Sequence, residues 1–175
     1  KRIAKNRGVA LHVKKFETGE YARKRKLSVQ MAARILRYDW FEKVRLKDDY
    51  SVIATAHHLD DSVETFFLNL VRGTGIRGLS GIKPKNGNVV RPLLFAKKDE
   101  IITYASQANL TFQEDASNVE DKYNRNFIRH NVIPQLEKLN PNFVESMQET
   151  MGRLAVCKEI YQQAILEMKA DIVEE

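Results

Sequence analysis

The sequence predicts an α/β fold, and three observations support this class. Residues 52–56 form an apolar run without polar alternation, which is typical of a strand buried on both faces of a parallel sheet. Residues 9–16 are apolar enough for an earlier strand, and a helical pattern separates the two segments. A second helical pattern follows the run at 52–56. The order strand, helix, strand, helix implies right-handed parallel crossovers, so we expect a parallel sheet.

Size and composition limit the class of protein further. A chain of 175 residues with 43% hydrophobic content can form one domain with a real core and has room for a small appendage. A net charge of +6 is compatible with an anionic partner. The single Cys157 excludes a disulfide framework and a cysteine-rich metal site, and it indicates a reducing, cytoplasmic setting. No apolar run reaches the roughly 20 residues of a membrane span.

The segment before the central strand is basic. Residues 1–7, closed by Gly8, are typical of the last turns of a helix, and the helical pattern at the other end continues to Glu175, so we expect a fragment of a longer protein. Residues 17–27 hold four consecutive basic residues without periodicity and predict a mobile loop. Ser28 is a good N-cap for the next helix. Its predicted apolar stripe is Val29, Ala33, Leu36, Trp40 and Val44, with Arg34, Arg37 and Tyr38 beside it.

The junction after residues 52–56 holds the main candidates for a site. Ligands of open α/β sheets bind where strands end and helices begin, and this junction carries His57, His58, Asp60, Asp61 and Glu64. Asp61 and Glu64 match a capping box, which alone would be an ordinary structural role. They also share a helical face with Leu68 and Val71, so they extend a stripe that faces the core. Buried acids need a cation, a metal or a donor, and a site is favoured.

The middle of the chain is rich in turn signals. Four of the 8 glycines lie at residues 73–81, where Gly73 would end the helix, and the segment is not a Walker loop because no Gly-Lys-Ser/Thr follows. Asn86-Gly87 within residues 82–90 predicts a hairpin. A helix should follow at residues 97–108.

The last third is predicted to be mainly helical. Residues 110–112 could form a short strand before the polar turn at 114–118. A helix should begin near Asn124, with Arg125, Arg129, Val132 and Leu136 on one face and a kink at Pro134. Arginines in a first turn oppose the helix dipole unless an anion lies nearby, so a phosphate or carboxylate partner is favoured. Asn140-Pro141 should start a long packing helix with Phe143, Met147, Met151, Leu154 and Ile160.

Together these motifs resemble one family, the bacterial tRNA(Ile)-lysidine synthetases of the N-type ATP pyrophosphatase group. The resemblance rests on six motifs in order: Ala33-Arg34-x-x-Arg37-Tyr38, His57-His58-x-Asp60-Asp61-x-x-Glu64-Thr65, Arg72-Gly-Thr-Gly-x-x-Gly-Leu-x-Gly81, Arg91-Pro-Leu-Leu94, Asp115-x-Ser-Asn118 and Arg125-Asn126-x-x-Arg129. The Ser-Gly-Gly-x-Asp-Ser phosphate loop of that family does not occur in this sequence. We therefore expect this chain alone to be inactive and prone to self-association.

The resemblance implies a fold and an activity. The fold would be a partial doubly wound parallel sheet, Rossmann-like and similar to adenine nucleotide alpha hydrolases, followed by a small helical subdomain. Residues 1–110 would be the C-terminal part of the catalytic domain, and 111–175 a connecting segment and helical subdomain. The activity would be ATP-dependent ligation of free lysine to the wobble cytidine of tRNA(Ile) with a CAU anticodon, through an adenylated intermediate and with Mg²⁺. A homodimer is one assembly that such an enzyme could form.

The resemblance also implies roles for individual residues. Asp61 and Glu64 would bind lysine or Mg²⁺, and His57 would lie at the nucleotide. Phosphates would be faced by Arg34 or Arg37 together with Arg125 and Arg129. The remaining candidates for the ATP or substrate site are His58, Arg72, Gly73 and Gly75.

Three other interpretations stay open. A metal-dependent phosphohydrolase could use His57, His58, Asp60 and Asp61, although such sites normally need further ligands. A non-catalytic tRNA-binding module would tolerate Asp61→Asn. A sulfur-inserting relative of the same group would call for more cysteines than Cys157.

Overall fold

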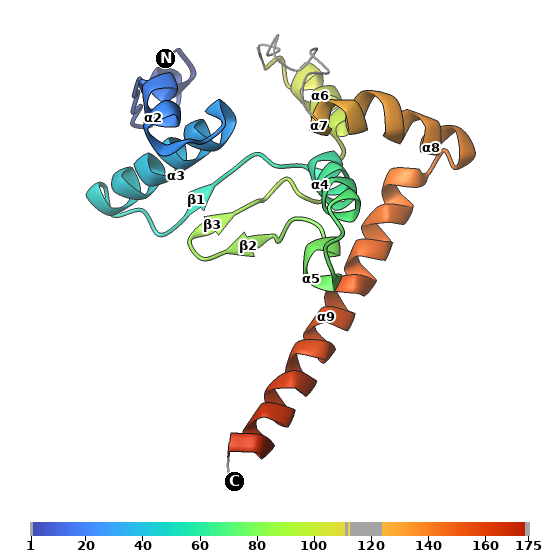
Figure 1. Ribbon diagram of the computed structural model, residues 1–175. Helices are drawn as coiled ribbons and strands as arrows, with labels where there is room; N and C mark the ends of the chain where they lie inside the picture. Colours follow the sequence, from blue (N-terminus) through green and yellow to red (C-terminus); the bar gives the residue numbers. More distant parts are fainter. Residues whose placement is uncertain (1, 111, 113–123, 174–175) are drawn as a thin grey trace. The chain divides into compact units, whose positions relative to one another are not determined.

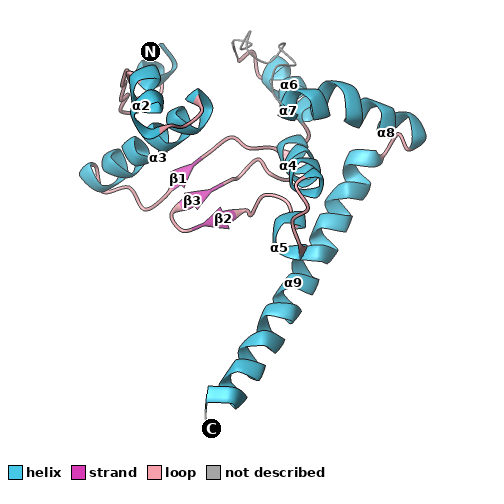
Figure 2. Cartoon of the chain, viewed as in Figure 1, coloured by secondary structure: helices cyan, strands magenta, loops and turns pink. Residues whose placement is uncertain are grey.

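The computed structural model describes residues 2–110, 112 and 124–173 (Figure 1). The chain divides into two compact units, Lys1–Ile53 and Ala54–Glu175. Both helices and strands are present, and helices predominate (Figure 2). The predicted α/β class is therefore confirmed. Among the described residues, no helix combines the length and apolar character needed to cross a membrane.

The first unit contains three helices, α1 (Arg2–Asn6), α2 (Thr18–Arg25) and α3 (Val29–Lys47). The predicted start of α3 is confirmed, because Ser28 Oγ accepts a hydrogen bond from the Met31 amide at 3.2 Å. The predicted stripe is only partly correct. Val29 is 61% exposed within this structure, whereas Ala32, outside the predicted stripe, is fully buried. Burial on α3 begins one position away from the expected face because α2 packs there.

The prediction of a basic loop at residues 17–27 is wrong, because this segment contains the helix α2. Glu20 pairs with Lys24 at 2.7 Å in the favourable i, i+4 order, and the Arg25 guanidinium lies over the Tyr21 ring. Lys26 ends the helix in the left-handed conformation, and its amide bonds back to Ala22. These contacts between neighbours stabilise a helix whose sequence lacks an apolar period.

The predicted strand at residues 9–16 is also wrong. The segment has no regular structure, and Val9, Leu11 and Val13 are 59%, 50% and 71% exposed. A strand requires a neighbour for its amides and carbonyls. Within the described ranges the sheet consists of other segments, so these alternating apolar side chains stay uncovered.

The sheet is small. Its strands are β1 (Ile53–Ala54), β2 (Lys85–Asn86) and β3 (Val89–Val90), in the order β1-β3-β2. The Asn86-Gly87 hairpin is confirmed, with β2 and β3 antiparallel and Asn86 opposite Val89. The expected strand at residues 52–56 is shorter than predicted and is not buried on both faces, because Val52 is 44% exposed. The described strands therefore do not show a doubly wound parallel sheet.

Helices build the rest of the second unit. They are α4 (Leu59–Val71), α5 (Ile76–Leu79), α6 (Lys98–Gln107), α7 (Asn124–Phe127), α8 (Ile133–Leu139) and α9 (Phe143–Val173). Gly73 follows the end of α4 with a φ of +71°, as predicted. A π-helical turn at Ile128–Val132 joins α7 to α8 just before Pro134, so the expected break is confirmed. Phe112 has no strand, and residues 114–118 lie outside the described ranges.

The core of this unit lies where α4, the π-helical turn and the first half of α9 meet (Figure 1). Its buried members are Leu59, Val63, Phe66, Ile128, Ile133, Val144, Met147 and Met151. The long packing helix is thus confirmed for Met147 and Met151, but Ile160 is 66% exposed. Val71, expected to share the core face of α4, is 81% exposed, so that face ends before the last turn of the helix.

Candidate active site

The start of α4 is fixed by a cap made of its own side chains. His58 is the N-cap, and its backbone amide donates to Asp61 Oδ2 at 2.9 Å. The capping box considered as an alternative for Asp61 and Glu64 does not form, because the box joins His58 to Asp61 one turn earlier. This shift leaves the carboxylate of Glu64 free of any capping role. It also fixes the rotamer of Asp61, whose other oxygen points away from the cap.

Asp60 connects the starts of two helices. Its Oδ2 lies 3.1 Å from His58 Nδ1 and accepts a hydrogen bond from the Lys98 amide at 2.8 Å, at the start of α6. Burial opposes the charged form of this carboxyl, but the bonds from His58 and Lys98 outweigh burial and lower the pKa of Asp60. An ionised carboxylate is also favoured by the positive end of the α6 dipole. Asp60 was part of the predicted cluster, but its partner on α6 was not foreseen.

Glu64 is the most buried charged residue described in the chain, with 0% of its surface exposed. Both carboxylate oxygens are occupied. Oε2 accepts from Arg125 Nε at 2.6 Å, and Oε1 accepts from Arg129 Nε at 2.5 Å. Two charge-assisted bonds satisfy the requirement that a buried carboxylate be paired.

Asp61 completes this network. Its Oδ1 accepts from Arg125 Nη2 at 2.7 Å and lies 3.8 Å from Arg129 Nη2. One arginine, Arg125, thus bridges both acids at the helix start. The burial of Arg129 favours its neutral form, but the bond to Glu64 and the nearby acids outweigh this and raise the pKa of the guanidinium. Arginine side chains stay charged in proteins, so the network holds two permanent cations.

The π-helical turn sets the spacing of the two arginines. Arg125 lies in α7 and Arg129 in the turn, four residues on, and both side chains reach the same acids. The wider π-helical turn changes the angular position of Arg129 relative to a regular helix. Side chains 61 and 65 residues apart in the sequence meet in this way at the N-terminus of α4.

The structure groups some of the predicted site residues and separates others. His57 follows β1, and its Nδ1 is 2.9 Å from Thr55 Oγ1. Thr55 was not predicted, and a hydroxyl two residues before a histidine gives little signal in a sequence. His57 lies at the N-terminal end of α4. The other predicted residues at this end are His58, Asp61, Glu64, Arg125 and Arg129.

The remaining candidates lie elsewhere. Arg72, Gly73 and Gly75 are at the opposite end of α4, and about 16 Å of helix axis separates Asp61 from Arg72 at 1.5 Å per residue. Arg34 belongs to the first unit, where its guanidinium lies 4.9 Å from the centre of the Tyr38 ring. Arg37 is exposed on the same helix, α3.

A magnesium ion at this acid pair would have to displace a guanidinium, as a lysine ammonium would. Mg²⁺ requires carboxylate oxygens at its coordination distance, but every carboxylate oxygen of Asp61 and Glu64 already accepts a hydrogen bond from an arginine or an amide. The described part of the chain also holds no group of three or more His, Cys, Asp or Glu side chains suited to a metal. The predicted magnesium role of these two residues gains no support from the geometry.

Comparison with known proteins shows which family and which individual proteins this chain resembles. The family model described as "PP-loop domain" matches residues 1–136. A Bacteroides thetaiotaomicron protein named tRNA(Ile)-lysidine synthase is 46% identical over 99% of this chain and 41% of its own length. Proteins of the same name from Parabacteroides distasonis and Thermosipho africanus are 42% and 41% identical over 98% and 83% of this chain. The chain spans about two fifths of the length of the B. thetaiotaomicron and P. distasonis relatives, at 41% and 39%.

A solved structure shares the fold of this chain. A solved structure titled "U34-tRNA thiolase NcsA from Methanococcus maripaludis with its [4Fe-4S] cluster" superposes with a TM-score of 0.66 at 18% identity. The match covers 87% of this chain and 53% of that chain, which at this identity shows a shared fold. Because the family model covers most of the chain, including the acid pair and both arginines, the chain belongs to the PP-loop domain family.

Proposed function

We propose that the full-length protein ligates lysine to the wobble cytidine of the tRNA(Ile) with a CAU anticodon, at the expense of ATP. The support is the match of 99% of this chain, at 46% identity, to a protein named tRNA(Ile)-lysidine synthase. The observation in the structure that carries the proposal is the Asp61–Glu64 pair, of which Glu64 is fully buried, and the pair lies within the matched region. Two acids held at a helix start can receive a cationic substrate.

The reaction has two steps. The carbonyl oxygen of the cytosine attacks the α-phosphate of ATP, and pyrophosphate leaves. The lysine amine then attacks the activated ring carbon, loses a proton and expels AMP. Positive side chains are needed where phosphate charge develops, and negative ones where the ammonium group of lysine binds.

The paired arginines suggest how both needs are met by the same residues. In this structure the acids are neutralised by Arg125 and Arg129, so a lysine ammonium must replace a guanidinium before it can bind. Arg125 is the more suitable to leave, because its side chain is 37% exposed against 21% for Arg129. A displaced arginine would then be available to the phosphates of the nucleotide, for which its planar fork is suited.

The other expected roles remain part of the proposal. His57 would lie at the nucleotide and either Arg34 or Arg37 would face its phosphates, and His58, Arg72, Gly73 and Gly75 would contact ATP or the substrate. The protein would act in the cytoplasm, and a homodimer is one arrangement for it.

The sheet would be larger in the full-length protein than in this chain. A doubly wound parallel sheet would result. Residues 1–110 would then belong to the catalytic domain, and 111–175 to the connecting segment and helical subdomain.

The test is lysidine formation by the full-length protein with ATP, lysine and tRNA(Ile). Asp61→Asn and Glu64→Gln should each lower the single-turnover rate by about a hundredfold or more, the scale for loss of one preorganised charged partner. Thermal unfolding of each variant controls for loss of the fold. Normal rates in both folded variants would reduce the acids to a structural role, as expected of a tRNA-binding module.

A second measurement tests whether the lysine ammonium replaces the guanidinium of Arg125. Arg125→Ala should weaken adenylate formation while lysine binds at least as tightly as before, because a competing cation has been removed. Weaker lysine binding in this variant would show that the guanidinium holds the substrate and is not displaced by it.

A further inference from the structure

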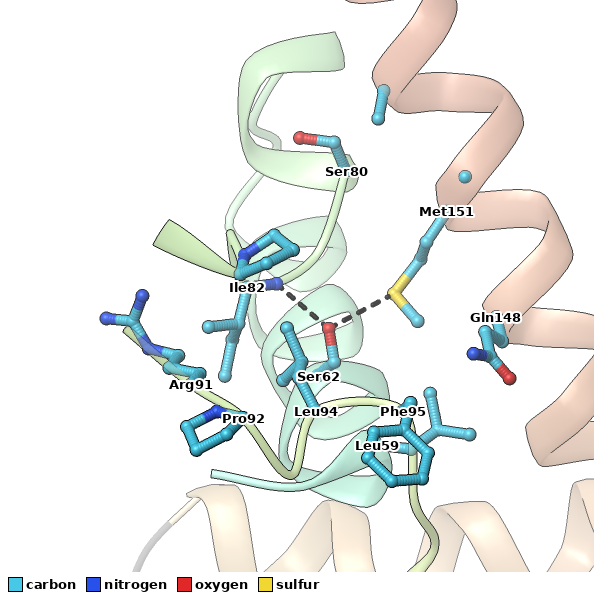
Figure 3. Close-up of a pocket in the computed structure, with 13 residues that line it drawn as sticks. Leu59, Ser62, Ser80, Ile82, Arg91, Pro92, Leu94, Phe95, Gln148 and Met151 are labelled. Carbon is cyan, nitrogen blue, oxygen red and sulfur yellow. Dashed lines mark hydrogen bonds between the residues drawn. The ribbon is translucent and has the colours of Figure 1, made fainter. Parts of the chain in front are cut away.

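A pocket outside the acid–arginine network remains without a function. It has a volume of about 420 Å³ and lies between the start of α4, residues 80–84, residues 91–95 and one face of α9 (Figure 3). This volume falls within the range of small-ligand sites, roughly 300–1,000 Å³. All its walls belong to the second unit.

The inner wall of the pocket is mostly apolar and contains one hydrogen-bonded hydroxyl. Ser62 Oγ accepts from the Ile82 amide at 2.9 Å and donates to Met151 Sδ at 3.7 Å, as Figure 3 shows. One hydroxyl therefore connects α4, the segment after α5 and α9, and its hydrogen bonds are directed to the protein. Gly81 lies against the same two side chains. The surface left for a ligand is mostly apolar, and its larger polar side chains are those of Arg91 and Gln148.

An aromatic ring lines the pocket, and exposed lysines are neighbours of its lining residues in the sequence, with the exposed acids Asp99 and Glu100 directly after Lys98. Phe95 lines the pocket although 72% of its surface is exposed. Lys98 follows it on the surface, and Lys83 and Lys85, both exposed, flank the lining residue Pro84. At another edge, Lys158 Nζ lies 3.4 Å from Ser80 Oγ. Among the described lining residues none is acidic, and the charged one is Arg91.

We propose that this pocket receives an unpaired base of an RNA, stacked on Phe95, with the neighbouring phosphates near Lys98, Lys83 and Lys85. Stacking on an aromatic ring combined with a positive surface is how single-stranded RNA is held without readout of its sequence. An apolar peptide would also fit the walls, but it would gain nothing from the lysines. The inference rests on the proposed function and deepens it, since an anticodon loop is the RNA that this enzyme would hold.

The pocket also has a place in the proposed reaction. Leu59 and Ser62 line it from the first turns of α4, the same helix start that carries Asp61 and Glu64. A base next to the reacting cytidine would be held here while the cytidine lies beside the acid–arginine network, where the lysine would bind. Holding a neighbouring base would orient the target without touching it.

The experiment measures binding of a fluorescein-labelled seven-nucleotide RNA, with CAU at its centre, to the full-length protein. Phe95→Ala should weaken binding about five- to 150-fold, the range for loss of one base stacked on an aromatic ring. Phe95→Tyr should restore it. Tyr104→Ala is the matched control, because Tyr104 is 67% exposed on α6 and does not line the pocket. Since Phe95 is exposed, the fold should survive, and thermal unfolding checks this.

Two further arms identify the occupant. Seven RNAs are compared, each with an abasic residue at a different position. For one of these RNAs only, Phe95→Ala should no longer weaken binding, because the base that stacks on Phe95 is already missing. Lys98→Ala should reduce the slope of log affinity against log salt by about 0.7, whereas Phe95→Ala should leave the slope unchanged.

Equal effects of Phe95→Ala and Tyr104→Ala would overturn the inference, as would the absence of RNA binding at low salt. Full competition by AMP would assign the pocket to a free nucleotide and overturn it as well. The outcome for the pocket is separate from that for the proposed function. If Phe95→Ala weakens RNA binding but the protein forms no lysidine, the proposed function is refuted and the RNA pocket stands. If the protein forms lysidine but Phe95→Ala does not affect RNA binding, the pocket is refuted and the proposed function stands.

Discussion

Glu64→Gln is the substitution whose effect on stability the structure specifies best. The side chain is fully buried and each carboxylate oxygen accepts one guanidinium N–H. Glutamine has the same shape, but it removes the charge and presents an NH₂ group to one of two arginines. Breaking a buried ion pair costs about 3–5 kcal/mol. Because the Arg125 and Arg129 side chains are 37% and 21% exposed, water can solvate the released charges, and we expect about 2–3 kcal/mol.

The assay is urea unfolding of this chain with a double-mutant cycle. Glu64→Gln should lower the urea midpoint, and the cost should fall when Arg129→Gln is already present, with a coupling energy of at least about 1 kcal/mol. Glu159→Gln on the exposed face of α9 is the control and should stay within about 0.5 kcal/mol of the parent. Additive effects of Glu64→Gln and Arg129→Gln would refute the ion-pair network as described.

Three further outcomes follow from single features. Because hydrogen bonds lower the pKa of the Asp60 carboxyl, its stabilisation is present above the unfolded value of about 3.9 and lost as pH falls through the lower folded value. Asp60→Asn should thus destabilise at neutral pH, and urea midpoints should converge with those of the parent under strongly acidic conditions. Gly81→Ala should cost about 1–3 kcal/mol more than Gly87→Ala, since its Cβ would collide with Ser62 Oγ and Met151 Sδ whereas Gly87 has no neighbour there. Neutralising residues 23–26 in the full-length protein should flatten the log–log salt dependence of tRNA affinity, by about 0.7–0.9 for each phosphate that these side chains bind.

The elements that the sequence predicted correctly carry local signals. Ser28 caps α3, Gly73 follows the end of α4 and Asn86-Gly87 forms the hairpin, and each of these depends on a few neighbouring residues. The long helix α9 was also predicted, because its period repeats over many turns.

The errors have non-local causes. Residues 9–16 have the composition of a strand, but a strand forms only where another one pairs with it. In the opposite sense, α2 forms although its sequence is polar, because Ala22 is buried against α3 and neighbouring side chains pair along the helix. A pattern along the chain contains neither the strand neighbour that a segment needs nor the helix against which a short segment packs.

The candidate site shows the same limit in its chemistry. Two inferences were made separately from the sequence: buried acids at 61 and 64 need a cation, and arginines in a first helical turn need an anion. Each inference is correct, and the structure satisfies both with a single set of contacts between Asp61, Glu64, Arg125 and Arg129. The arginines already have an anionic partner, so their placement alone does not predict a bound phosphate. The acids already have cationic partners, so their burial alone does not predict a bound lysine. If the protein binds both substrates here, it must exchange internal ion pairs for external ones, so its affinity for lysine depends on how readily Arg125 leaves.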